Sequence, residues 1–196
     1  RQGRAMDRPG LAALAVLMLL AAPPAGAAPV AYDLQPDASN VTFETDFGGA
    51  LITGDIPLEA ADLVIDFDRL ANCRIDVTLN AAKAGASFPF AADAMKGASV
   101  LDTRAHPKMR FTSTSVAARG DGASVKGNLT IRGVTRPVTL EARIWRQQGT
   151  ETGDRSRLTI QLTGAVNRSD FGATGFADMV SDRVRITITA RIIRRD

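Results

Sequence analysis

The residue types that most often carry out catalysis are scarce in this chain. One histidine, His106, and one cysteine, Cys73, occur among 196 residues. A Ser-His-Asp or Cys-His mechanism would have to use His106, which precedes a proline in an expected loop, and no Gly-x-Ser-x-Gly nucleophile motif is present. A zinc site needs several ligands, which a lone histidine cannot supply. We therefore expect a protein that is not an enzyme and holds no metal.

Bulky apolar side chains are the more informative group. Phe and Met residues concentrate in expected loops and beside an expected helix, in excess of what a plain two-sheet core requires. With two strand leucines they are the candidate lining of an apolar ligand site: Phe43, Phe47, Phe88, Phe90, Met95, Met109, Phe111, Leu129, Leu140, Phe171, Phe176 and Met179. Each of them could instead simply fill the core, and the sequence leaves both interpretations open.

The elements that must position these side chains are β-strands. From Val184 to Ile192, apolar residues occupy every second position, which is typical of a strand with one buried face. Strands are predicted at 32–34, 41–47, 51–56, 62–66, 73–80, 108–116, 124–131, 135–145, 157–167 and 183–194. One short helix is predicted to begin after Pro89 and to end near Gly97. We expect an all-β fold whose antiparallel sheet curls on itself.

The N-terminal segment has the pattern of an export signal. Basic residues precede an apolar run over residues 11–22, and prolines and small residues follow it. The run is shorter than the roughly 20 residues that a membrane-spanning helix needs. We therefore expect a cleaved signal peptide at 1–27 and one domain at 28–196. The expected destination is the periplasm of a Gram-negative bacterium, with no stable membrane span after cleavage.

The charged residues give little support to a nucleic-acid partner. Arg143, Arg157, Arg185 and Arg191 fall at outward strand positions instead of gathering in a patch with aromatic residues. These positions are typical of a solvated face, and a strand wall facing lipid would not tolerate such charges cheaply. We therefore expect no nucleic-acid binding. Whether the protein forms a homodimer is left open.

Three motifs resemble those of the YceI-like proteins. Gly127–Val138 is similar to the G-x-L-T-x-x-G-V-T-x-x-V hairpin of that family, Leu101–Phe111 to its stretch ending in P-x-[IM]-x-F, and Asn167–Gly172 to its R-x-D-F-G. The resemblance implies an extended, eight-stranded, lipocalin-like antiparallel barrel with one short helix. It also implies an apolar cavity for an isoprenoid lipid, such as a polyprenyl phosphate or an isoprenoid quinone, and no further cofactor.

Arg168 and Asp170 are the charged residues of the third motif and are candidate polar contacts for a ligand. They flank Ser169 at an expected strand end, so they could instead form an ion pair with each other or with Asp182. The alternative to a lipid carrier is a solid-core barrel that acts in stress response or protein interaction. A bulky substitution such as Ala142→Trp would unfold a filled core, whereas a cavity would accept it.

Overall fold

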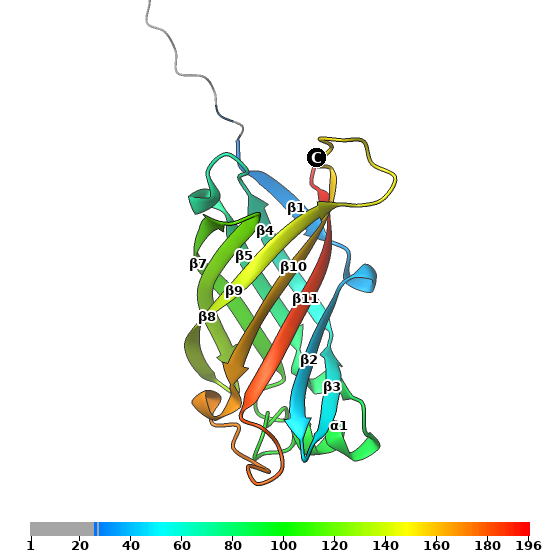
Figure 1. The fold of residues 1–196 in the computed structure, drawn as a ribbon, viewed down its shortest axis with the longest axis vertical. Helices are drawn as coiled ribbons and strands as arrows, with labels where there is room; N and C mark the ends of the chain where they lie inside the picture. The colour runs from blue at the N-terminus through cyan, green and yellow to red at the C-terminus, as the bar shows by residue number, and fades with distance from the viewer. Residues whose placement is uncertain (1–25, 27) are drawn as a thin grey trace, which may run out of the picture.

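The computed structural model describes residue 26 and residues 28–196, which form an elongated barrel (Figure 1). The predicted signal peptide at 1–27 lies outside the described residues, apart from residue 26. In the described part of the chain, no helix combines the length and the apolar character that crossing a membrane would require.

The predicted strands and the predicted helix are present with small shifts at their ends. In chain order the strands are β1 (Val30–Leu34), β2 (Asn40–Phe47), β3 (Ala50–Ile56), β4 (Leu58–Ile65), β5 (Arg74–Asn80), β6 (Gly85–Ala86), β7 (Lys108–Arg119), β8 (Gly122–Ile131), β9 (Val134–Arg146), β10 (Arg157–Asn167) and β11 (Arg183–Arg194). The helix α1 (Pro89–Lys96) lies between β6 and β7. Alternate residues of β5 are buried, as the period of two predicts.

Eight strands of the described chain close into a ring. Their order is β1-β4-β5-β7-β8-β9-β10-β11, and antiparallel pairing of β1 with β11 completes the circle. Tyr32 pairs with Arg194 and Leu34 with Ile192 at this closure. Because neighbours in the ring are antiparallel, two-residue turns can join them, as they do between β7 and β8 and between β8 and β9. The predicted all-β, eight-stranded antiparallel barrel with one short helix is confirmed.

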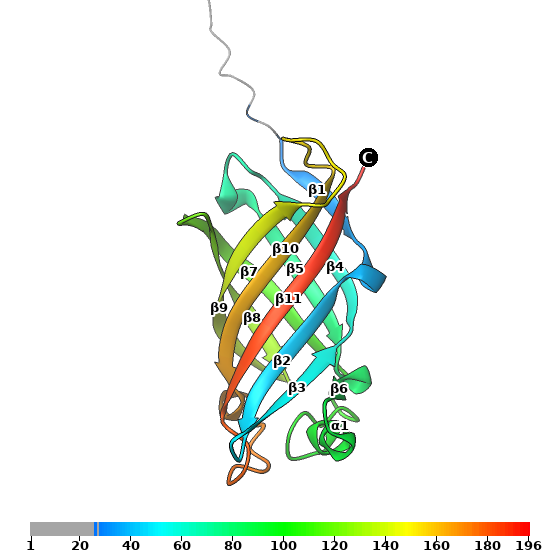
Figure 2. The same cartoon turned by 45° about the vertical axis from the view of Figure 1, so that its right-hand side comes forward.

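Three further strands lengthen the wall beyond the ring. The C-terminal end of β11 pairs with β1, and residues 185–189 of β11 pair with β2. β1 and β2 therefore lie end to end along the same edge of β11. A short 3-10 turn, Pro36–Ala38, interrupts that line. In the same way β3 pairs with β2, and β6 pairs with β3. The result is a barrel much longer than it is wide, with β2, β3 and β6 at the end where α1 lies (Figure 2).

The end of the barrel at which β1 closes the ring is filled by its own side chains. Tyr32, Leu158 and Ile192 are fully buried there and belong to one continuous core with Ile65 and Ile75. The Tyr32 hydroxyl donates a hydrogen bond of 2.8 Å to the carbonyl of Arg155, which satisfies its polar atom. Burial raises the pKa of Tyr32. This half of the barrel is a solid core.

The helix α1 lies against the opposite end, beside β3 and β6 (Figure 2). Pro89 starts it, where a missing N–H costs nothing, and the N–H of Gly97 bonds to the carbonyl of Ala94 at its end. None of its residues is fully buried, so it covers the barrel end, with Met95 packed against the edge of the core. The following loop folds back on it, because the N–H of Leu101 bonds to the carbonyl of Met95.

Candidate functional site

The half of the barrel away from the solid core is hollow. Its cavity has a volume of about 600 Å³, which lies within the range of about 300–1,000 Å³ that ligand sites occupy. Apolar side chains from strands, from α1 and from the loop between β10 and β11 line it. Among the described residues that line it, Thr45 and Arg168 bring polar side chains.

All twelve apolar residues that were predicted from the sequence to line a ligand site line this one cavity. They are Phe43, Phe47, Phe88, Phe90, Met95, Met109, Phe111, Leu129, Leu140, Phe171, Phe176 and Met179. Sequence reasoning missed the smaller strand residues between them: Val41, Ile52, Ile56, Val77, Leu79, Ile131, Val138, Val166, Val184, Ile186 and Ile188. The alternation shows that these residues face the inside of the barrel, but residues that fill a core have the same pattern. Contact of any of these residues with a ligand stays a prediction.

The change from core to cavity occurs partway along individual strands. On β11, Ile192 is buried in the solid core, whereas Ile188 and Val184 line the cavity. On β5, Leu79 lines the cavity, whereas Ile75 does not, although both are buried. The inward face is apolar in both halves, so the alternation of residues along a strand does not distinguish the packed half from the hollow half.

Glycines on the inner face let large side chains lie along the wall. A Cβ placed on Gly127 would stand 2.5 Å from the Phe111 ring, and one on Gly164 would stand 2.5 Å from Cδ2 of Leu140. Phe111 and Leu140 therefore lie across these glycines and do not extend over the lumen.

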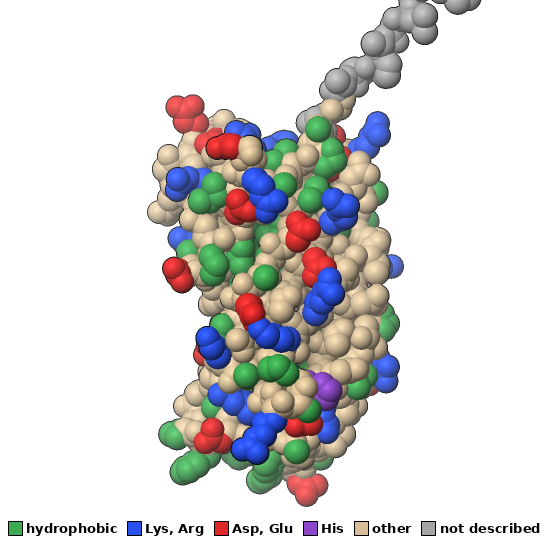
Figure 3. All heavy atoms as spheres, turned by 180° about the vertical axis from the view of Figure 1, so that it is seen from behind, with side chains coloured by type: hydrophobic (Ala, Val, Ile, Leu, Met, Phe, Trp, Pro, Cys, Tyr) green, Lys and Arg blue, Asp and Glu red, His purple; other side chains and the backbone are tan. Residues whose placement is uncertain are grey.

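The cavity opens at the end of the barrel that carries α1. The Phe47 and Phe88 rings stand against each other there, with centroids 6.3 Å apart and planes tilted by 52°. Phe90 and Met179 line the cavity and yet are 85% and 52% exposed. Figure 3 shows hydrophobic side chains at this end of the molecule, with charged side chains between them. The mouth is thus apolar inside and outside.

Arg168 fixes the loop that forms one side of the mouth. Its guanidinium donates hydrogen bonds to the carbonyls of Ser181 (3.0 Å), Ala173 (2.7 Å), Gly175 (2.6 Å) and Val180 (2.9 Å). One side chain therefore gathers both arms of the loop between β10 and β11. The four carbonyls replace the hydrogen bonds that water would otherwise make with the charged guanidinium.

The ion pair that was the alternative role for Arg168 is not formed within the described part of the chain. Among the residues that the structure describes, its guanidinium bonds to carbonyls and makes no ion pair, while Asp182 accepts bonds from the N–H (2.8 Å) and the hydroxyl (2.7 Å) of Ser169. The reason is that residues 168–171 form a 3-10 turn where a strand end was expected. The turn leaves Asp170 exposed and outside the cavity lining, so Asp170 is not placed to contact a ligand there.

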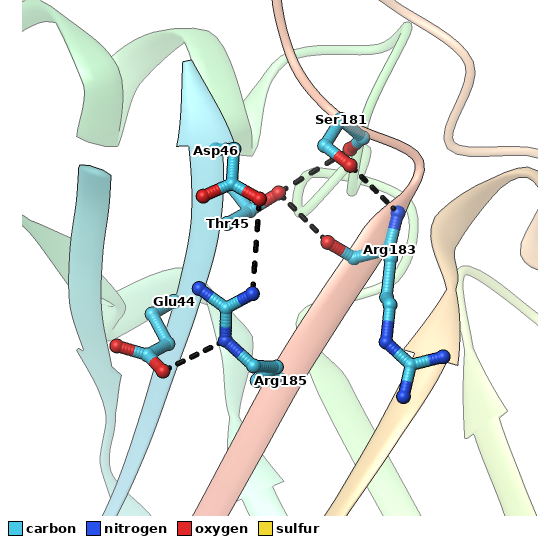
Figure 4. A network of polar contacts seen from close by, with 6 residues as sticks. All are labelled: Glu44, Thr45, Asp46, Ser181, Arg183 and Arg185. Carbon is cyan, nitrogen blue, oxygen red and sulfur yellow. Dashed lines mark hydrogen bonds and ion pairs between the residues drawn. The ribbon is translucent and has the colours of Figure 1, made fainter. Parts of the chain in front are cut away.

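Thr45 is the second polar side chain in the lining, and its hydroxyl is engaged with the protein. Thr45 Oγ1 lies 2.9 Å from the carbonyl of Arg183 and 3.3 Å from that of Ser181 (Figure 4). The neighbouring Glu44 and Asp46 point to the outer face, where Arg185 Nε lies 2.8 Å from Glu44 and Nη1 lies 3.7 Å from Asp46. The charges of Glu44, Asp46 and Arg185 therefore lie on the outer face of this part of the wall.

The residues that could have performed chemistry lie outside the cavity lining. Cys73 contacts the backbone of Asp66, and burial raises the pKa of its thiol. The His106 ring packs over the turn at Arg132 and Gly133, whose φ angles are +54° and +71°, as the predicted turn requires. In the described part of the chain, no three His, Cys, Asp or Glu side chains gather to hold a metal ion. The arrangement can enclose an apolar molecule.

The chain is similar to known proteins over most of its length. It is 28% identical over 178 residues to the UPF0312 protein of Serratia proteamaculans strain 568, a match that covers 90% of this chain and 92% of that protein. Its fold is similar to Burkholderia cenocepacia BcnA, with a TM-score of 0.72 at 21% identity over 81% of this chain and 99% of that chain. It is also similar to a polyisoprenoid binding domain from Saccharophagus degradans implicated in plant cell wall breakdown, with a TM-score of 0.61 at 13% identity over 85% of this chain and 99% of that domain. The YceI-like domain matches residues 32–192, and the chain therefore belongs to the YceI-like family.

Proposed function

We propose that this protein is a non-catalytic carrier that holds a long isoprenoid lipid in the hollow half of its barrel. The observation that carries the proposal is the cavity of about 600 Å³ with an almost wholly apolar lining. The choice of an isoprenoid is supported by the family and by the similar fold of the polyisoprenoid binding domain from Saccharophagus degradans. A polyprenyl phosphate and an isoprenoid quinone both fit this class.

Burial of the prenyl chain in the cavity supplies the affinity of the protein for the lipid. Each methylene group that leaves water contributes roughly 0.8 kcal/mol, so many weak contacts along a prenyl chain add up to firm binding. No directional contact is needed for this, which suits a lining of Phe, Met and aliphatic side chains. The hollow half also argues against the alternative of a solid-core barrel that acts without a lipid.

The lining favours one orientation of the lipid. Its deep part, next to the solid core, is made by side chains such as Ile188, Val77 and Leu140, which offer no polar partner. The two polar side chains, Thr45 and Arg168, bond to carbonyls of residues 173–183, in and beside the loop at the mouth. A prenyl tail therefore enters first, and a polar head stays at the mouth, where water can solvate it.

The site of action proposed for the mature chain is the bacterial periplasm. The export pattern at 1–27 supports it, as does a fold whose stability comes from a hydrophobic core. An isoprenoid carrier is useful in that compartment, because a free prenyl chain does not cross water on its own.

Extraction of the protein's own lipid tests the proposal. The protein is produced with its leader in a Gram-negative host, purified from the periplasm and extracted, and the extract is analysed by mass spectrometry. We expect an isoprenoid lipid in near-stoichiometric amount. The absence of any lipid from folded periplasmic protein would contradict the proposal.

A matched pair of variants on β9 ties the lipid to the cavity. Val138 lines the cavity, whereas its neighbour Thr139 is exposed on the outer face. Val138→Trp should fill part of the lumen and lower the amount of extracted lipid, and Thr139→Trp should leave it unchanged. Equal lipid in the two variants would place the lipid somewhere other than the cavity.

A further inference from the structure

The mouth of the cavity is surrounded by exposed apolar side chains. We call Phe88, Phe90, Phe176 and Met179 the rim. Phe90 lies in α1 and Phe88 directly precedes that helix, whereas Phe176 and Met179 lie in the loop between β10 and β11. The helix and the loop are at the same end of the barrel (Figure 1). Exposed apolar clusters of this kind mark surfaces that another partner covers.

The rim is continuous with the lumen. All four rim residues also line the cavity, so that a surface which covers the rim also covers the mouth. A partner at this place therefore meets any apolar molecule that enters or leaves. The partner must offer an apolar environment of its own, because otherwise the prenyl chain would cross water at the junction.

The charges around the rim do not favour a highly charged partner. Residues 87–107 carry Asp93, Lys96, Asp102 and Arg104, and residues 172–182 carry two further aspartates and no Lys or Arg. The two segments together are slightly acidic, and Arg132, which donates a hydrogen bond to the carbonyl of Gly172, offsets part of this charge. The rim would therefore not be drawn strongly to an anionic surface by charge. The contact that it can make is mainly apolar.

We propose that the rim inserts into the surface of a lipid bilayer and places the cavity mouth against its hydrocarbon. This rests on the proposed function, since an isoprenoid lipid resides in bilayers and must pass between bilayer and barrel. Phe and Met side chains on a helix start and a loop are suited to the boundary between headgroups and acyl chains. The rim then shields the prenyl chain from water during transfer.

A single-tryptophan reporter tests the insertion directly. Trp145 is the one tryptophan of the chain, and it is exposed on β9, outside the rim. In the double variant Trp145→Phe and Phe90→Trp, the tryptophan sits on the rim. Lipid-free protein mixed with phosphatidylcholine and phosphatidylethanolamine vesicles should show a blue-shifted emission that brominated lipids quench. Wild-type Trp145 should show neither change.

Flotation with the same vesicles tests the contribution of the rim. Phe90→Asp and Met179→Asp should each weaken vesicle binding by about tenfold or more, because a charge replaces an apolar side chain that the bilayer would bury on docking. The matched control is Trp145→Asp, which removes an exposed apolar side chain elsewhere and should leave binding unchanged. Anionic lipid should not strengthen binding, and salt should not weaken it.

Three results would overturn the docking proposal. These are no vesicle binding by the wild type, binding that requires anionic lipid, and a dimer in solution that Phe90→Asp converts to a monomer, since a second copy would then cover the rim. The outcome is separate from that of the carrier proposal, because the vesicle assays use lipid-free protein. Recovery of isoprenoid without vesicle binding would refute the docking and leave the carrier function in place.

Discussion

The ring of Phe43 in β2 lies directly over Gly54 in β3. The two residues are paired across the strands, and a Cβ placed on Gly54 would stand 2.3 Å from Cζ of the ring. The ring therefore occupies the place of a missing side chain and lies along the wall. That Cβ would also stand 2.3 Å from the carbonyl oxygen of Gly85, so a substitution at Gly54 would disturb the backbone of β6 as well.

Gly164→Ala tests the packing of a large side chain over a glycine of the neighbouring strand, with less disturbance of the backbone than a substitution at Gly54. The added Cβ would stand 2.5 Å from Cδ2 of Leu140 and 3.2 Å from the carbonyl of Thr139. Leu140 must turn toward the lumen, so we expect less bound lipid and a loss of about 1 kcal/mol in the free energy of unfolding. Lipid extraction and urea unfolding measure the two effects. Thr163→Ala on the outer face of β10 is the control and should change neither.

Two tryptophan substitutions on β9 should distinguish the solid half from the hollow half. Ala142 is buried in the solid core, whereas Val138 lines the cavity. Ala142→Trp should overpack the core and lower the free energy of unfolding by about 3 kcal/mol or more, while Val138→Trp should cost less than about 1.5 kcal/mol. Urea unfolding of the lipid-free proteins gives both values. Similar losses would mean that the barrel is filled along its whole length.

Arg168→Met should loosen the loop at the mouth. The substitution removes a guanidinium that bonds to four carbonyls and leaves those carbonyls without their partner. We expect a loss of about 3 kcal/mol in stability and faster hydrogen exchange of residues 173–181. Arg183→Met is the control, because the Arg183 guanidinium is exposed and points away from its neighbours in Figure 4. Unchanged exchange in the Arg168 variant would show that the loop holds without the side chain.

Asp66 should make the solid end sensitive to acid. Asp66 is a buried residue, and its carboxylate accepts hydrogen bonds from Nδ2 of Asn72 (2.8 Å) and the N–H groups of Arg69 and Asp68. The Asn72 bond first, and then the backbone bonds, lower the pKa of Asp66. A pKa below the unfolded value of about 3.9 means that the contribution to stability is complete above about pH 4 and is lost as the pH falls below it.

Asn72→Ala tests the acid dependence. The variant should be less stable than the wild type near neutral pH, and the difference should shrink near pH 3, where the carboxyl of Asp66 is increasingly protonated in both proteins. Urea unfolding at the two pH values measures the difference. Asn128→Ala on the exposed face of β8 should show no such change. A difference that stays constant with pH would mean that Asn72 acts through packing alone.

Local patterns in the sequence were enough to place most elements. β10 and β11 were predicted with the bounds that the structure has. The helix predicted to begin after Pro89 and to end near Gly97 runs from Pro89 to Lys96. These features depend on neighbours in the chain: alternation identifies a strand with one buried face, and Pro and Gly delimit a short helix. The excess of Phe and Met in loops also identified a set of residues that the fold brings together around one cavity.

The sequence by itself thus determined the strands, the turns, the helix and the inward face of each strand. Only the tertiary structure decided where that face is packed and where it borders the cavity. Ile192 and Val184 lie on the same side of one strand, and their surroundings differ because β11 pairs with β1 at one end and with β2 farther along. The tertiary structure also decided that Arg168 bonds to carbonyls, because the partners depend on a turn and a loop fold that residue spacing does not encode. Period and composition are local properties, whereas the volume enclosed by a barrel is set by contacts between segments far apart in the chain.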